Sequence, residues 1–176
     1  MLDVECIING YLEENCYILN IDKKALIIDP GDEAERILKV VKDNKYEVIG
    51  ILITHHHFDH VGALKKVMDE FPVAKVIDNK NSGDIVLEPF QFKIIETPGH
   101  TSDSVSFYFE SFSVLFSGDF VFKGTIGNFK DEDEKDMLKS LKLLKYIPKE
   151  VTIYPGHGEP TTIGDELENN PFLKGI

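Results

Sequence analysis

A histidine-rich turn between two apolar segments constrains this sequence most. Residues 48–53 form a short, mostly β-branched run of the kind found in buried strands, and a helical pattern begins at Ala63. The nine residues between them, THHHFDHVG, contain four histidines and one aspartate. Folds that alternate strands and helices place functional side chains in such turns, because the strand end holds the turn rigidly. The segment predicts a mixed α and β fold with a functional turn after this strand.

The turn offers candidate metal ligands at four positions. His55 and His57 are two residues apart, so both side chains can point to the same side of an extended backbone. Asp59 and His60 follow on the bend. Imidazole nitrogen and carboxylate oxygen are the usual ligands of zinc and similar divalent metals. The side chain of His56 should point away from its neighbours, so we expect it to be solvated or to support the site from outside.

The other two histidines and a second aspartate lie in similar positions. His100 lies in the loop TPGHT and His157 in the loop YPGHG, and each loop follows a strand-like apolar run. Asp119 ends another such run. A single loop histidine or aspartate most often caps a turn, but this many at four strand ends predicts a metal centre. The candidate ligands are His55, His57, Asp59, His60, His100, Asp119 and His157.

Apolar alternation and turn residues predict the remaining elements. Strands are expected at residues 4–8, 16–21, 25–28, 48–53, 73–77, 90–95, 104–109, 114–116 and 151–154. Helices are expected from residue 32, where Asp32 and Glu35 resemble a capping box, and over residues 63–71, 131–146 and 164–169. Neither a repeat nor a linker is evident, so these elements predict one domain of mixed α and β structure.

The ordered string His55-x-His57-x-Asp59-His60, His100, Asp119, His157 resembles the signature of the metallo-β-lactamase superfamily. Shorter segments are similar to its small hydroxyacylglutathione-hydrolase-like (glyoxalase II-like) branch: residues 15–17, 28–31, 97–101, 116–119, 158–164 and 170–172. The resemblance covers nearly the whole chain and implies a single domain over residues 1–176. Its expected fold is an αββα sandwich of the α+β class, in which two mixed β-sheets pack together with helices outside. Periodicity alone supports only mixed α and β.

The resemblance also implies a dinuclear centre, and seven ligands do exceed the needs of one tetrahedral zinc. Zinc is the expected metal, with iron or manganese as alternatives. Asp59 is, in addition, the candidate catalytic residue. Asp29 either orients a ligand histidine from behind or serves only the Asp-Pro-Gly turn that follows it. The implied ligand sets are His55, His57 and His100 for the first metal and Asp59, His60 and His157 for the second, with Asp119 bridging.

The implied reaction is hydrolysis of a thioester or related ester by a metal-bound hydroxide. Alternatives are a mononuclear iron persulfide dioxygenase or a lactonase of the same superfamily. A metal-binding structural domain is a third interpretation, but a structural zinc site needs only about four ligands and this chain offers seven. Glyoxalase II has a further helical domain that contacts glutathione, whereas this chain ends at Ile176, and Asn128 stands where many relatives have arginine. We therefore expect weak dependence on glutathione, with Lys123, Asn128 and residues 79–84 as its nearest candidate contacts.

The charge and the amino-acid composition limit the classes of partner and the cellular location that we expect. A net charge of −12 argues against nucleic acid as a partner. The amino-terminal segment has no signal-peptide pattern, and every apolar run falls short of the roughly 20 residues that span a bilayer. Cys6 and Cys16 are expected to be free, buried core residues, although pairing of their strands would allow a disulfide. These features predict a cytoplasmic enzyme with a small-molecule substrate and leave the oligomeric state open.

Overall fold

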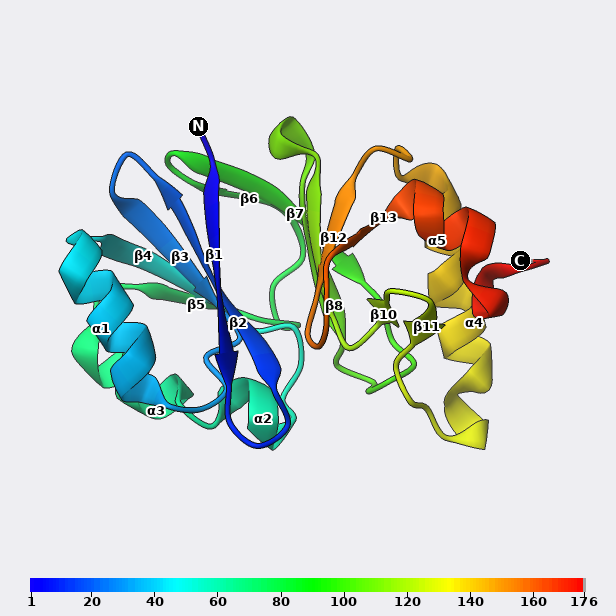
Figure 1. Cartoon of the computed structure of the whole chain (residues 1–176), viewed down its shortest axis with the longest axis horizontal. Coiled ribbons are helices and arrows are strands. Elements are labelled where there is room, and N and C mark those ends of the chain that lie inside the picture. Colours follow the sequence, from blue (N-terminus) through cyan, green and yellow to red (C-terminus); the bar gives the residue numbers. More distant parts are fainter. Residues whose placement is uncertain (176) are drawn as a thin grey trace.

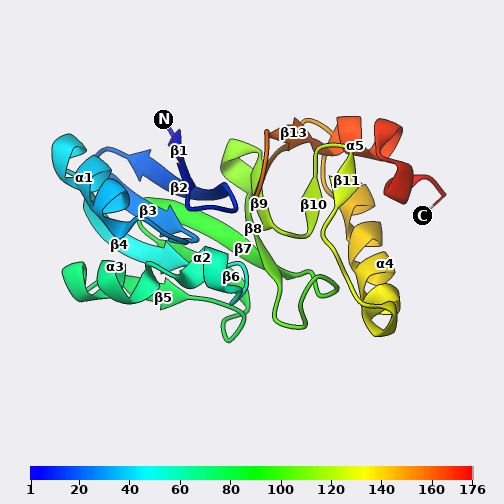
Figure 2. The ribbon, with the colours of Figure 1, turned by 60° about the horizontal axis from the view of Figure 1, so that its bottom comes forward.

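Two β-sheets lie face to face at the centre of the computed structural model, and helices cover their outer faces (Figure 1). The structure describes residues 1–175. The first sheet has five strands and the second has six, and a separate two-stranded hairpin lies beside the second sheet (Figure 2). This arrangement confirms the αββα sandwich of the α+β class that the sequence resemblance implied.

The first sheet has the order β1-β2-β3-β4-β5, with β1 (Asp3–Asn9), β2 (Glu14–Ile21), β3 (Lys24–Ile28), β4 (Glu47–Leu52) and β5 (Lys75–Ile77). The second has the order β13-β12-β9-β8-β7-β6, with β6 (Gly83–Leu87), β7 (Phe90–Glu96), β8 (Val105–Phe109), β9 (Val114–Gly118), β12 (Thr152–Pro155) and β13 (Thr161–Thr162). Both sheets are mixed: β4 pairs in parallel with β3 and β5, and β12 with β9, while the other pairs are antiparallel.

The hairpin consists of β10 (Val121–Phe122) and β11 (Thr125–Ile126). The helices are α1 (Ala34–Asn44), α2 (Phe58–Val61), α3 (Leu64–Glu70), α4 (Glu134–Leu143) and α5 (Ile163–Asn169). Short 3-10 turns occur at Glu110–Phe112, Asp131–Asp133, Leu144–Tyr146 and Pro171–Leu173. None of the helices within residues 1–175 is both long and apolar enough to cross a lipid bilayer.

Three apolar layers hold these elements together, because strand side chains alternate between the two faces of a sheet. On β3, Leu26 and Ile28 face the second sheet and meet phenylalanines of β7, β8 and β9. Ile27, between them, faces the other way and packs with Ile37 and Val41 of α1. A third cluster joins the outer face of the second sheet to α4 and α5. Burial of each Leu, Ile or Phe side chain stabilises the folded chain by about 1.5–3 kcal/mol. Both faces of each sheet carry such side chains, so each face is covered by another layer.

The predicted capping box at Asp32 and Glu35 is wrong. The helix begins at Ala34, after Glu33 in a left-handed conformation with φ of 45°. Asp32 Oδ1 accepts a hydrogen bond from the next backbone N–H, that of Glu33, at 2.7 Å, and the Glu35 side chain pairs with Lys66 instead. Local turn geometry therefore outcompetes the cap, since aspartate readily hydrogen-bonds the backbone beside it.

The two cysteines are free, as expected, but only Cys16 is buried, and Cys6 is exposed. In the β1–β2 ladder Cys6 lies opposite Tyr17 and Cys16 opposite Ile7. Residues directly opposite share a face of the sheet, so the two cysteines point to opposite faces and cannot bond. Burial of Cys6 was thus a wrong prediction, and the reason is its place on an edge strand.

Four strands were absent from the prediction, namely β6, β10, β11 and β13. The longest of them, β6, begins at Gly83 and pairs with β7. This strand lies at the edge of the second sheet and most of its side chains are exposed or half-buried. An edge strand needs little apolar alternation, so its sequence resembles a turn.

Candidate metal centre

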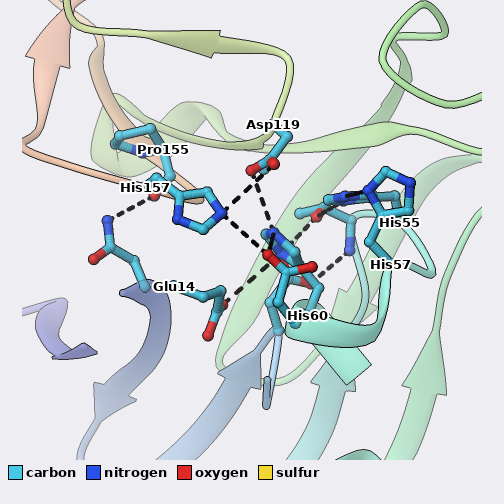
Figure 3. A network of polar contacts seen from close by, with 12 residues as sticks. Glu14, His55, His57, His60, Asp119, Pro155 and His157 are labelled. Carbon is cyan, nitrogen blue, oxygen red and sulfur yellow. Dashed lines mark hydrogen bonds and ion pairs between the residues drawn. The ribbon is translucent and has the colours of Figure 1, made fainter. Parts of the chain in front are cut away.

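The seven predicted ligands come together at one end of the sandwich, although they come from four separate segments. The histidine-rich turn leaves β4 and enters α2, His100 follows β7, Asp119 follows β9, and His157 follows β12. Figure 3 shows His55, His57, His60, Asp119 and His157 around a common centre. Each segment is held at a strand end, so the sheet packing determines where the side chains meet.

The first group of nitrogens belongs to His55, His57 and His100. His57 Nδ1 lies 3.2 Å from His55 Nε2 and 2.9 Å from His100 Nε2. These separations fit a tetrahedral zinc, whose Zn–N bonds of about 2.0–2.1 Å place neighbouring nitrogens about 3.3 Å apart. Burial, followed by the charge of His60, lowers the pKa of His55 to about 3, and burial followed by His100 lowers that of His57. Both rings are therefore neutral at pH 7 and offer lone pairs.

The second group contains Asp59, His60 and His157. Asp59 Oδ2 lies 3.3 Å from His157 Nε2 and 3.8 Å from His60 Nε2. Asp119 lies between the groups: its Oδ1 is 3.2 Å from His60 Nε2, and its Oδ2 is 3.6 Å from His100 Nε2 and 3.6 Å from His157 Nε2. Asp119 therefore contacts histidines of both groups.

Two buried atoms in this centre have no hydrogen-bond partner, namely His60 Nε2 and Asp119 Oδ1. Buried polar atoms are nearly always satisfied, so these two atoms are consistent with ligands of a cation. Burial lowers the pKa of His60, but Asp119 and Asp29 outweigh it and raise that pKa to about 11. Burial likewise raises the pKa of Asp119, yet His60 brings it down to about 2. The metal-free centre therefore holds an ion pair that a divalent metal can replace, and the residues fit such a metal.

In three of the histidines, the ring nitrogen that faces away from the centre contacts an oxygen atom behind it. His60 Nδ1 lies 2.9 Å from Asp29 Oδ2, His100 Nδ1 lies 2.6 Å from the Asn128 carbonyl oxygen, and His157 Nδ1 lies 3.0 Å from that of Leu12. A proton on each outward nitrogen satisfies these contacts and leaves Nε2 free to coordinate. The three rings thus have both their orientation and their tautomer set by the fold.

Asp29 connects the end of β3 to the histidine-rich turn. Its Oδ1 accepts a hydrogen bond from the Thr54 backbone N–H at 2.7 Å, and its Oδ2 accepts one from the Thr54 hydroxyl at 2.6 Å. The same Oδ2 faces His60. Asp29 is thus placed both to shape the turn and to orient a ligand histidine, the two roles that the sequence left open.

The loop of His157 is held against β2. Asn15 Nδ2 donates to the carbonyl oxygens of Pro155 (3.1 Å) and Gly158 (2.8 Å), and the Tyr17 hydroxyl donates to that of Pro155 (2.6 Å). Gly156 is required here because a Cβ at this position would collide with Asp119 Oδ1 and His60 Cε1. The Asn15-Cys16-Tyr17 segment therefore positions a loop of the opposite sheet.

Comparison with known proteins identifies the family behind this geometry. The family model described as the metallo-beta-lactamase superfamily matches residues 10–84 and 76–157. The chain belongs to the metallo-β-lactamase superfamily. Its relatives by sequence include hydroxyacylglutathione hydrolase GloC of Haemophilus influenzae, which is 31% identical over 98% of this chain and 98% of that protein.

Solved structures of the superfamily agree over almost the whole chain. The BLEG-1 B3 metallo-beta-lactamase superposes with a TM-score of 0.91, is 33% identical, and covers 98% of this chain and 100% of its own. TTHA1623, solved in a di-iron-bound form, superposes with a TM-score of 0.85, is 30% identical, and covers 96% of this chain and 100% of its own. Superfamily membership supports a metal-dependent enzyme, and the relatives matched by sequence include proteins named as hydrolases.

One buried residue beside the metal centre, Glu14, was not predicted from the sequence. Glu14 is 1% exposed, neither of its carboxyl oxygens has a hydrogen-bond partner, and Oε1 lies 3.8 Å from His60 Nδ1 (Figure 3). Burial, followed by the charge of Asp29, raises the pKa of Glu14 to about 10, so the group is neutral at pH 7. The one signal in the sequence was an acidic residue at the start of an otherwise apolar strand.

His56 points away from the centre, as its alternation with His55 and His57 predicts. Its Nδ1 lies 2.6 Å from Asp103 Oδ2, and its Nε2 lies 3.6 Å from Asp78 Oδ2. Asp103 belongs to the loop that also holds His100. His56 therefore joins the histidine-rich turn to that loop without facing the other ligands.

The centre opens into a cleft of about 560 Å³, lined by Leu12, His57, Phe58, Asp59, His100, Asp119, Phe122, Thr125, Ile126, Asn128 and His157. Of the suggested glutathione contacts, Asn128 lines this cleft, whereas Lys123 pairs with Glu159 at 2.8 Å. Residues 79–84 do not line it; Asn81 and Asp84 border another hollow beside β5 and β6. A larger hollow of about 720 Å³ lies between α1 and α3 and contains none of the seven candidate ligands.

Proposed function

We propose that this protein is a dinuclear metal-dependent hydrolase that acts on a thioester or a related ester. The observation that supports it most is the position of Asp119 between the two ligand groups, with Oδ1 unpartnered and buried beside His60. A structural zinc site uses about four ligands and is closed, whereas this centre offers seven and opens into a cleft.

The residues of the chain have separable tasks in this proposal. Bound divalent metals lower the pKa of water from about 15.7 to about 7 and polarise a carbonyl oxygen. Asp59 and Asp119 offset only part of the charge of two divalent cations, so the centre stays positive where a carbonyl oxygen would approach. Asp59 belongs to the second ligand group and also lines the cleft, so we propose that it orients the attacking water.

The substrate class draws its support from the relatives. GloC, named as a hydroxyacylglutathione hydrolase, matches over nearly the full length of both proteins. We take zinc as the first choice of metal because imidazole-rich sites suit it, while the di-iron form of TTHA1623 supports iron as the alternative. A small-molecule substrate, a cytoplasmic location and the absence of nucleic-acid or membrane partners stay predictions.

The test is elemental analysis of protein purified without chelator, followed by a substrate panel on the same preparation. We expect close to two divalent metals per chain and the highest kcat/KM on thioesters. The panel also includes a lactone, a β-lactam and a persulfide with oxygen uptake recorded. One iron per chain with oxygen consumption on the persulfide would establish the dioxygenase instead, and a preferred lactone would establish the lactonase. A reproducible single metal with full hydrolytic activity would overturn the dinuclear centre.

A further inference from the structure

The rim of the cleft over the metal centre is apolar and lacks cationic side chains. We propose that this rim selects a substrate with an apolar acyl group and an uncharged leaving thiol or alcohol. The proposal rests on the hydrolase function above and specifies the substrate for the same centre.

Apolar side chains border the cleft on both sides although water could reach them. On one side, Leu12 is 46% exposed and Phe58 is 74% exposed. On the other, Phe122 and Ile126 are half-buried. Exposed large apolar side chains that gather around a polar centre mark a binding surface, because scattered ones would be spread over the molecule. The rim is therefore suited to bind an apolar group of the substrate.

The first side of the rim is held at a set distance from the centre. Leu12 follows β1 in the turn to β2, and its carbonyl oxygen contacts His157 Nδ1 at 3.0 Å. Phe58 begins α2 directly before Asp59. An apolar group lying on these two side chains is thus positioned relative to two of the candidate ligands.

The second side belongs to the β10–β11 hairpin, which buried polar groups hold in place. The backbone N–H of Gly124 donates to Glu166 Oε2 at 2.9 Å, and Asn170 Nδ2 donates to the carbonyl oxygen of Thr125 at 2.9 Å. Glu166 and Asn170 are both buried. Phe122 and Ile126 are therefore presented by a hairpin that is fixed before a substrate binds, which lowers the entropic cost of binding.

A second hollow adjoins the first side of the rim. Leu12 and Phe58 also border this hollow of about 360 Å³, whose lining includes Tyr11 as well as Asp32 and Asp59. The two hollows share the side chains of Leu12 and Phe58, so an acyl chain of several carbons that leaves the cleft on this side would lie against both apolar side chains.

Charge on the rim argues against an anionic leaving group. Within residues 1–175, the lining of the cleft includes neither lysine nor arginine, and Thr125 and Asn128 are neutral. Lys123 is next to Phe122, but Glu159 pairs with it. The whole chain carries a net charge of −12, so long-range attraction of anions is also lacking. A leaving group with carboxylates would find its only opposite charge at the metals.

The test uses metal-loaded protein and three thioesters: acetyl and hexanoyl esters of N-acetylcysteamine, an uncharged thiol, and S-hexanoylglutathione. A fully buried methylene is worth about a fourfold factor, so four that are half-buried should raise kcat/KM on the order of tenfold from acetyl to hexanoyl. The hexanoylglutathione ester should be no better than its uncharged counterpart. An equal rate for acetyl and hexanoyl esters, or a tenfold preference for the glutathione ester, would overturn the proposal.

Variants locate the effect. Leu12→Ser and Phe58→Ser should each reduce the hexanoyl-to-acetyl ratio of kcat/KM about threefold or more. Val73→Ser is the matched control, because Val73 is 88% exposed and lies between α3 and β5, outside the cleft lining. That variant should leave the ratio unchanged. A ratio that stays the same in the Leu12 and Phe58 variants would show that the chain-length effect arises elsewhere and would refute this rim.

A binding measurement separates this inference from the hydrolase function. The uncharged fluorescent amine N-phenyl-1-naphthylamine should bind the metal-loaded protein, be displaced by hexanoyl N-acetylcysteamine, and bind more weakly to the Leu12 and Phe58 variants. Such binding without hydrolysis of any thioester would refute the proposed reaction and leave the apolar rim standing. Hydrolysis with no dye binding and no chain-length effect would refute the rim and leave the reaction standing.

Discussion

Replacing Asp29 by asparagine tests whether this residue supports the metal centre or only shapes a turn. Asparagine keeps one carbonyl oxygen, which can still accept the hydrogen bond from the Thr54 backbone N–H. The amide nitrogen that replaces Oδ2 cannot accept one from the Thr54 hydroxyl or from His60 Nδ1, which lie 2.6 Å and 2.9 Å from Oδ2. The substitution therefore changes two buried contacts and leaves the volume of the side chain intact.

The size of the effect follows from these two contacts. Each of the two buried donors that loses its acceptor costs about 1–3 kcal/mol, so the free energy of unfolding should fall by about 2–6 kcal/mol. For a domain of this size the melting temperature should fall by roughly 4–24 °C, at about 2–4 °C per kcal/mol. Loss of the carboxylate that orients a ligand histidine typically lowers metal affinity by about 10–100-fold. We expect this loss of metal affinity at the second ligand group, because His60 belongs to it.

The assay is zinc titration against a competing chelator, with thermal unfolding of the metal-free protein in parallel. Asp32→Asn is the matched control, since it removes the same charge three residues away at an exposed position. We expect its metal affinity to stay within about twofold of the parent. If Asp29→Asn lowered stability but bound metal as tightly as the control, Asp29 would serve the turn alone.

Three further predictions concern the same centre. His57→Ala or Asp119→Ala should remove most activity and lower metal content, whereas His56→Ala should keep its metals and most of its rate; equal losses at His56 and His57 would contradict the orientation of the turn. Metal uptake near pH 7.5 should release protons, because the pKa of His60 is raised to about 11 in the metal-free protein and its ring must lose a proton to coordinate. The apparent affinity for the metal should then rise with pH. Calorimetry in buffers of different ionisation enthalpy measures the number of protons released, and a binding heat that does not depend on the buffer would refute the proton release. Asn15→Ala should lower the free energy of unfolding by about 1–3 kcal/mol by leaving the Pro155 and Gly158 carbonyls without its amide, measured by urea denaturation, and an unchanged midpoint would show that this contact is unimportant.

Features coded within a few residues were predictable from the sequence. The run of residues 48–53 and the turn after it identified four of the seven candidate ligands, since alternation along an extended backbone separates His56 from His55 and His57. Nine of the strands and the main helices also followed from periodicity, whereas β6, β10, β11 and β13 did not. The capping box failed because two local hydrogen-bonding patterns competed at Asp32, and propensity alone does not say which is lower in energy.

Contacts between distant segments depended on the tertiary structure. His100 and His57 are 43 residues apart, and Asn15 and Gly158 are 143 apart, yet each pair meets because the two sheets pack face to face. The burial of Glu14 and the apolar rim formed by Leu12 and Phe122 likewise require segments from both halves of the chain. Periodicity specifies which face of an element is apolar, but the partner of that face is chosen by packing. The sequence alone thus determined the ligand chemistry of this protein, while the packing of the sheets decided which groups surround it and what its cleft can receive.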